Sequence, residues 1–241
     1  MSFILLFTCG VIAWCFSTIV AGGAATILMP IISLWLGANL TAPVISIAAL
    51  LANPSRVYIF RNDIDWQVIR YMLPGSILGS ICGAWSISQI DATVIQFIIG
   101  SFLILYVVQQ FYFTERLNFR VVLPIFFPVG FIISYLSGLI GATGPAHNPF
   151  LVNYGLIKEK MIATKSLNSL IMQLTKLISY GSFGILTMQI GYYGLSLGLG
   201  AILGVIIAKS YLCRLDALQF KKYALFFMLI SGISLILKTM V

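Results

Sequence analysis

One stretch of the sequence carries polar side chains at helical spacing. They recur at three- and four-residue steps within residues 161–185, so they share one face of a helix. Its members are Lys165, Asn168, Ser169, Met172, Gln173 and Lys176. Eleven residues separate the two lysines, a rise of ~16 Å, so both cannot lie at the same end of the helix. Ammonium and amide groups on one face indicate a site for an anion.

Lys176 is the more informative of the two lysines. An ionisable group inside an apolar span costs several kcal/mol unless it faces a wet cavity or a counter-charge. No acidic residue lies within any apolar span, so a bound anion is a candidate partner. Two alternatives are that Lys176 reaches outward to the surface or lies beyond a shorter helix. Lys165 lies about one turn inside its end and could reach lipid phosphate instead.

A second polar face is predicted in the segment 41–59. Ser46, Asn53 and Arg56 follow one another at steps of seven and three, which places them on one side of a helix. The guanidinium fork of Arg56 would suit a sulfonate or carboxylate. Arg56 could equally be an anchor at the cytoplasmic end of a span.

Glycine-rich turns provide the third set of candidates. Helix N-termini beside such turns would offer free N–H groups and a positive dipole end to an anion, and glycine lets the ligand approach. Glycine could equally serve close helix packing. His147 titrates near neutral pH and could couple protons, or be an ordinary satisfied polar residue. The candidates here are Gly22, Gly23, Thr26, Gly141, Thr143, Gly144, His147 and Asn148.

The composition indicates whether these candidates lie in a soluble protein or in a membrane protein. Of the 241 residues, 60% are hydrophobic and only 8% charged, which predicts an integral membrane protein. The net charge of +8 sits in short loops between apolar runs, so a nucleic-acid surface is not expected. The four cysteines are scattered singly and form no metal-ligand pattern. We expect neither a metal nor a cofactor.

The apolar segments predict an all-α, multi-span helical bundle, because only helices or closed barrels satisfy their backbone in lipid. The segments at 24–36 and 146–155 are short and bounded by Gly and Pro, which predicts broken or re-entrant pieces. The ten segments are 3–20, 24–36, 41–59, 67–88, 92–113, 122–140, 146–155, 161–185, 190–208 and 222–238.

The loops predict an orientation in a bacterial inner membrane. If every segment crosses, Lys and Arg gather in the loops 56–65, 114–120, 156–160 and 209–222, which then face the cytoplasm. The opposite loops, at 37–40, 88–91, 141–146 and 186–189, contain neither residue. Both termini are therefore predicted outside. Asp63 and Asp65 are expected to cap the next helix at Trp66.

The two halves of the chain have similar patterns. A glycine-rich turn, a proline and a closing glycine follow in the same order around Pro30 and Gly37, and again around Pro149 and Gly155. Gly75, Gly79 and Gly83 form a ladder that either Gly194 and Gly198 or Gly200 and Gly204 could answer. We predict repeats at 1–120 and 121–241 within one transport domain. Five segments in each half, an odd number, would invert the second.

These motifs resemble the sulfite exporter TauE/SafE family of membrane transporters over nearly the whole chain. The resemblance rests on Pro30, on Asn53 with Arg56, on residues 61–66, on the Leu73-Pro74-Gly75 ladder and on residues 137–141. It implies export, or sometimes import, of sulfite, sulfonates such as sulfoacetate, or other small organic anions. The inverted halves independently predict an anion site at half-helix N-termini between the repeats. Residues 22–25 and 142–145 depart from the family's glycine runs, which leaves the substrate open.

Other functions are less consistent with the sequence. It contains no zinc-protease, serine-hydrolase or nucleotide-binding motif, so an enzyme is not expected and transport should be secondary. A passive anion channel, an importer of a related anion and a membrane scaffold remain open. The expected partners are a small anion and the lipid bilayer, with the protein a monomer or homodimer.

Overall fold

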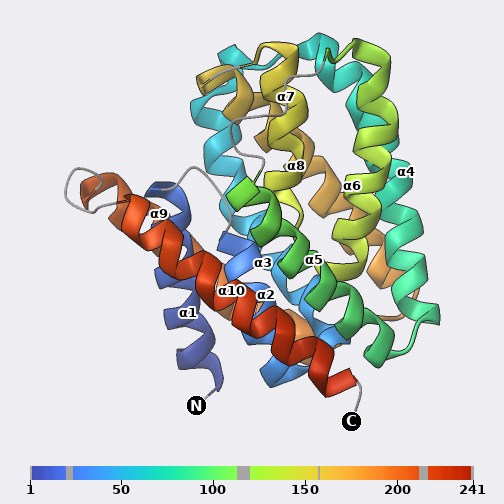
Figure 1. Ribbon diagram of the computed structural model, residues 1–241, viewed down its shortest axis with the longest axis vertical. Helices are drawn as coiled ribbons and strands as arrows, with labels where there is room; N and C mark the ends of the chain where they lie inside the picture. Colours follow the sequence, from blue (N-terminus) through green and yellow to red (C-terminus); the bar gives the residue numbers. More distant parts are fainter. Residues whose placement is uncertain (1, 20–23, 113–119, 157, 212–216, 240–241) are drawn as a thin grey trace.

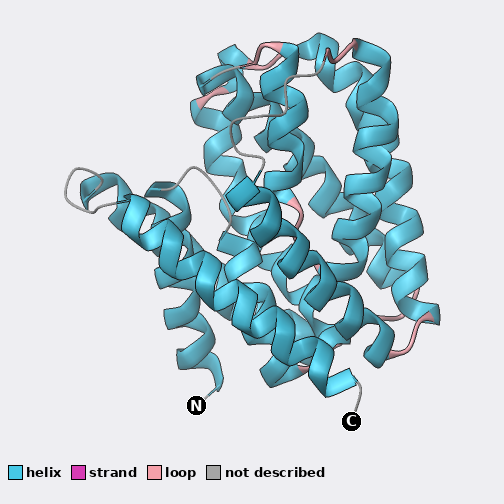
Figure 2. Ribbon diagram, viewed as in Figure 1, coloured by secondary structure: helices cyan, strands magenta, loops and turns pink. Residues whose placement is uncertain are grey.

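The computed structural model describes residues 2–19, 24–112, 120–156, 158–211 and 217–239. These residues form ten α-helices and three short 3-10 helices (η), and no strand occurs among them (Figure 2). The all-α prediction is confirmed. The helices are α1 (Ser2–Ile19), α2 (Ala24–Leu36), α3 (Ala38–Ile59), α4 (Trp66–Gln89), α5 (Ala92–Tyr112), α6 (Phe126–Ile140), α7 (Asn148–Tyr154), α8 (Lys158–Ser182), α9 (Met188–Tyr211) and α10 (Ala217–Thr239), with η1 (Arg61–Asp63), η2 (Leu123–Ile125) and η3 (Gly144–His147) between them.

The helices differ in whether they can cross a bilayer. Among the described residues, four stretches are long and apolar enough, namely Ala38–Ile59, Ala92–Gln110, Leu123–Ile140 and Met188–Ile207. With 13 and 7 residues, α2 and α7 reach only about 20 Å and about 10 Å, less than the hydrocarbon thickness of ~30 Å. The short segments predicted at 24–36 and 146–155 are therefore present.

The chain reverses direction inside the bundle where α6 ends. Gly141 adopts φ 100°, a conformation that favours glycine, and Gly141, Ala142 and Thr143 are all buried. Gly141 lies beside Ala42 and Ile45 in the first half of α3. The prediction of an external loop at 141–146 is therefore wrong, because α7 is too short to return across the membrane. The sides of the membrane assigned to the later loops do not change. α6 enters from one side and α7 returns to it, which has the same result as two crossings.

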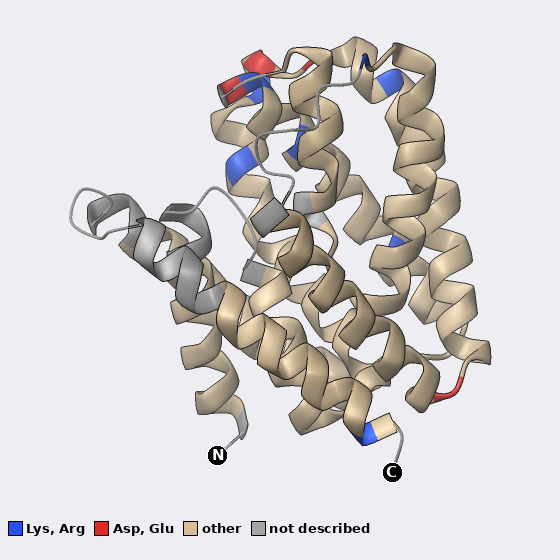
Figure 3. Ribbon diagram, viewed as in Figure 1, with Lys and Arg blue, Asp and Glu red and all other residues tan. Residues whose placement is uncertain are grey.

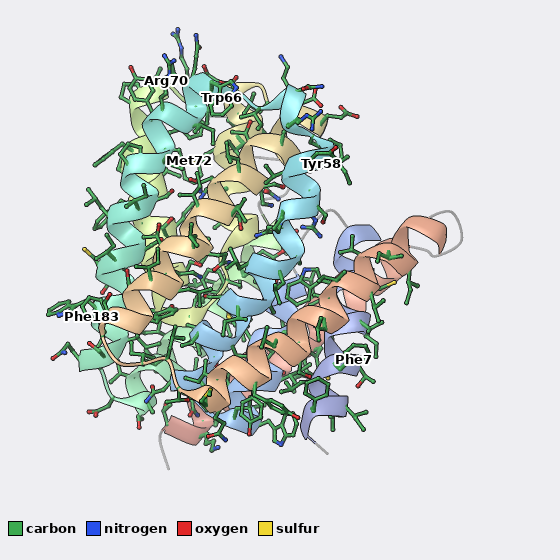
Figure 4. The ribbon with its side chains drawn as sticks, turned by 180° about the vertical axis from the view of Figure 1, so that it is seen from behind. Phe7, Tyr58, Trp66, Arg70, Met72 and Phe183 are labelled. Carbon is green, nitrogen blue, oxygen red and sulfur yellow. The ribbon has the colours of Figure 1, made fainter. Side chains whose placement is uncertain are left out.

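The two ends of the bundle differ in their content of charged residues. Lys and Arg lie mainly at the end that carries α7, whereas α1 begins and α10 ends at the opposite end (Figures 1 and 3). At the basic end, the Asp65 carboxylate accepts hydrogen bonds from the backbone N–H groups of Gln67 and Val68, each at 3.0 Å, which confirms the predicted cap of α4. Trp66 and Arg70 lie at this same end in Figure 4, as expected at a membrane interface.

Glycine allows two pairs of long helices to pack closely. α4 packs along α6, and α1 packs along α9. A Cβ atom at Gly75 would collide with the Phe127 carbonyl of α6, and one at Gly200 would collide with the Phe7 carbonyl of α1. Gly200 and Gly204 are therefore the counterparts of the Gly75–Gly79–Gly83 ladder in the second half. Gly194 and Gly198 instead accommodate side chains of α3.

We expect Gly79→Ala to lower the melting temperature of the detergent-purified protein. The new methyl group would meet the Phe131 backbone, and overpacking of this kind costs about 1–3 kcal/mol. The matched control is Gly191→Ala in α9, where no atom lies within 4 Å of the added Cβ and helix propensity favours alanine. Equal melting temperatures for the two variants would contradict the proposed close contact.

Candidate functional site

Lys176 is fully buried, and its ammonium group is hydrogen-bonded to the C-terminal end of α6, the helix that is interrupted inside the bundle. Its Nζ donates to the Ser137 carbonyl at 3.3 Å, the Ser137 hydroxyl at 3.0 Å and the Gly141 carbonyl at 3.2 Å. An ammonium group has three donors, so these contacts use all of them. Lys176 therefore neither reaches outward nor lies beyond its helix, and it has protein partners where none was expected from the sequence.

Electrostatics explain the position of Lys176. The last carbonyl groups of a helix lack intrahelical partners and carry a partial negative charge, which is costly inside a bundle. The ammonium group satisfies the Gly141 carbonyl and adds a second donor to the Ser137 carbonyl, which also accepts the Gly141 N–H at 2.9 Å. Tyr180, one turn further along α8, donates a 2.5 Å hydrogen bond to the Gly138 carbonyl. As a substrate-binding residue Lys176 stays a prediction. Its contacts show a residue that stabilises the interruption of α6.

The residues after the interruption return beside α6. The Thr143 hydroxyl is buried and donates to the Ile133 carbonyl at 2.9 Å, which holds the returning segment against α6. Gly144 begins η3, and the buried His147 ends it directly before Asn148. In the first half, Thr26 is buried in α2, whereas Gly22 and Gly23 lie outside the described residues.

Several predicted residues meet nearer the basic end. The Lys165 ammonium donates to the Asn148 side-chain oxygen at 2.8 Å, which joins α8 to the start of α7. The Asn53 amide donates to the Ser169 hydroxyl at 2.9 Å, which joins α3 to α8 one turn deeper. Arg56 lies close enough to Lys165 for its positive charge to act on the ammonium group. The two predicted polar faces therefore oppose one another.

The interior between these two groups of residues is polar. Within α4 and α8, as far as the structure describes them, four buried side-chain oxygens have no hydrogen-bond partner, those of Ser76, Ser80, Asn168 and Gln173. Such groups are normally satisfied by water or a ligand. They come from α4 and α8, two helices that pack against each other, and Asn168 and Gln173 lie between Lys165 and Lys176 in α8.

Three contributors to these contacts were not among the predicted site residues. Ser137 belongs to a glycine motif that was interpreted as a turn, although its hydroxyl and carbonyl are what Lys176 binds. Tyr180 follows Lys176 by four residues, so helical spacing alone placed it on the same face. Ser169 was on the predicted polar face, but its partner in α3 could not be assigned without the fold.

Comparison with known protein families identifies the chain. The family model for sulfite exporter TauE/SafE matches residues 6–235, nearly the whole sequence. The chain belongs to this family. The match confirms the resemblance inferred from the glycine, proline and Arg61–Trp66 motifs. No curated protein and no solved structure matches the chain.

TauE/SafE membership establishes a membrane transporter. The apolar helices agree with this class, and the end of α6 and Lys176 lie buried among them. Among the described residues, no group of three or more His, Cys, Asp or Glu side chains is placed to hold a metal ion. The polar interior of this TauE/SafE protein therefore offers lysine, arginine, amide and hydroxyl groups to a ligand.

We expect Lys176→Met to destabilise the protein by about 1–3 kcal/mol, because the buried Gly141 carbonyl would keep only a 3.5 Å hydrogen bond from the Ser137 hydroxyl. The measurement is thermal unfolding in detergent, with hydrogen exchange of residues 137–143 as the local readout. Lys160→Met, an exposed position in the first turn of α8, is the matched control. Unchanged exchange at 137–143 would contradict the assigned role of Lys176.

Proposed function

We propose that the protein is a secondary transporter that exports small organosulfur or other organic anions, such as sulfite or sulfoacetate, across the bacterial inner membrane. The family provides the class of activity. The observation that carries the proposal is the interrupted helix α6, whose end, return and cationic partners are buried within a helical bundle. Interrupted helices beside a polar interior are typical of secondary transporters.

The helix pairing supports two inverted repeats, 1–120 and 121–241. The first helix of each half packs along the fourth helix of the other half, α1 on α9 and α6 on α4. The glycine contacts are reciprocal, since Gly200 meets Phe7 as Gly75 meets Phe127. Gly37 and Gly155, which follow the short helices α2 and α7, both have φ near 100°. Two halves related by a two-fold axis in the membrane plane would produce this pattern.

In this proposal the anion binds between the halves, where the short helices begin and where the polar faces of α3 and α8 meet. The negative end of α6 is already neutralised by Lys176, so it does not repel an approaching anion. Export would follow the membrane potential, which favours outward movement of negative charge.

The transport activity is tested in proteoliposomes that contain the purified protein. Uptake of 35S-labelled sulfite should exceed that of empty vesicles and should saturate with concentration. Thr143→Val should lower the rate about tenfold, because the loss of one buried hydrogen bond, ~1.4 kcal/mol, loosens the returning chain. Thr175→Val is the matched control, since its hydroxyl bonds only within α8. Uptake that rises linearly without saturation would identify a passive channel instead.

We propose that both termini face the periplasm and that the basic end faces the cytoplasm, as the positive-inside rule requires. The test introduces single cysteines into a chain whose four native cysteines have been replaced. A membrane-impermeant maleimide added to intact spheroplasts should label Asp91→Cys and leave Asn62→Cys unlabelled, since these exposed positions lie at opposite ends of α4. The reverse labelling pattern would overturn the orientation.

A further inference from the structure

Two cations from different helices lie together inside the basic end of the bundle. Arg56 is in the last turn of α3 and Lys165 is in the third turn of α8. Both side chains are partly buried, and the Asn53–Ser169 hydrogen bond sets α3 beside α8 about one turn deeper than both cations. Repulsion between two such cations is stronger here than in water, because the surrounding protein has a lower dielectric constant. An arrangement of this kind is stable when an anion lies between or beside the two charges.

The described part of the chain contains no carboxylate paired with either cation. The Asp65 carboxylate, which is at the same end of the bundle, is engaged with the first backbone N–H groups of α4. Lys165 uses one of its three donors on Asn148, and no hydrogen bond from the Arg56 guanidinium to another described residue is present. Donors of both residues are thus available to a ligand.

Neutral side chains hold the two cations in position. Asn148 fixes the Lys165 ammonium at the start of α7, and the Asn53–Ser169 hydrogen bond holds α3 against α8 one turn deeper. The Asn168 amide oxygen is buried next to this contact without a partner among the described residues. An amide oxygen and nitrogen are interchangeable by rotation of the side chain, so Asn168 can present a donor to a bound anion.

We propose that Arg56 and Lys165 together form a binding site for a divalent oxoanion, with Asn168 as a neutral ligand. This inference rests on the proposed transport function and names the charge class of its substrate. A dianion neutralises both cations, whereas a monoanion leaves one positive charge uncompensated within the bundle. The planar guanidinium binds two oxygens of one anion at once, and the ammonium group binds a third.

Lys176 is not part of this site. Its three donors are used by the end of α6, and about 16 Å of helix rise separates it from Lys165. The two lysines of α8 therefore have different tasks. One satisfies the protein's own carbonyl groups and the other is available to a ligand.

The test compares sulfate with methanesulfonate, which share a tetrahedral head but differ by one charge. Their effects on the melting temperature of the purified protein are measured at equal concentration, since a ligand of the native state raises it. Sulfate should stabilise the wild type more than methanesulfonate does. Arg56→Gln and Lys165→Gln should each weaken sulfate binding about tenfold and remove the preference between the two anions. Arg56→Lys should retain the preference with weaker binding, because the charge stays and the fork is lost.

Lys160→Gln is the matched control, because it removes an exposed charge from the same helix. Its sulfate response should equal that of the wild type. Equal stabilisation by sulfate and methanesulfonate, no effect of sulfate on the wild type, or an unchanged response in Arg56→Gln would each overturn the site. Circular dichroism and gel filtration establish that each variant is folded before its response is interpreted.

Two further experiments are needed. One distinguishes a free anion from a lipid phosphate, and the other distinguishes failure of the transport function from failure of the two-cation site. The same titration is repeated in nanodiscs of phosphatidylcholine with and without phosphatidylglycerol. If the anionic lipid abolishes the response to sulfate, the cations bind a lipid phosphate and the inference is wrong. If wild-type proteoliposomes carry no anion, the transport function fails. If they transport while Arg56→Gln and Lys165→Gln keep the wild-type KM, only the two-cation site fails.

Discussion

The interruption of α6 imposes the constraint on which much of the interior depends. A helix that ends inside a bundle leaves carbonyl groups without partners, and lipid supplies no hydrogen bonds to replace them. Gly141 finds its donor in Lys176, which also binds the Ser137 carbonyl, and Gly138 finds its donor in Tyr180. Both donors belong to α8, so α8 has to lie inside the bundle, against α3 and α4, with its polar face enclosed. Burial of a lysine and interruption of a helix are therefore two parts of one arrangement.

The glycine contacts determine how the two halves of the chain are joined. The pairs α1 with α9 and α4 with α6 each combine one helix from residues 1–120 with one from 121–241. In lipid no hydrophobic force drives helices together, so close backbone approach at Gly75 and Gly200 supplies dispersion contacts instead. The halves are interlocked rather than adjacent.

The sequence was sufficient for the helices but not for the contacts between them. Apolar length, glycine and proline predicted all ten helices, including the two short ones, because these signals act within a few residues. The external loop at 141–146 was predicted wrongly, since the alternation of sides assumed that α7 crosses. The polar face of α8 and that of Ser46, Asn53 and Arg56 in α3 were recognisable from spacing, but their opposition required the fold. The partner of Lys176 was not, because carbonyl groups are present at every residue and have no signature in a sequence.

The two lysines of α8 illustrate how similar residues acquire different chemistry from their surroundings. Lys176 donates to carbonyl oxygens of a helix end, whose partial charge of about half an electron compensates it without any acidic residue. Lys165 donates to a neutral amide and lies near the positive charge of Arg56, so its charge is not compensated by the protein. A transported anion must bind and then leave, which a carboxylate in permanent contact with Lys165 would prevent by competition. The shortage of acidic residues in the spans therefore agrees with the proposed transport of anions.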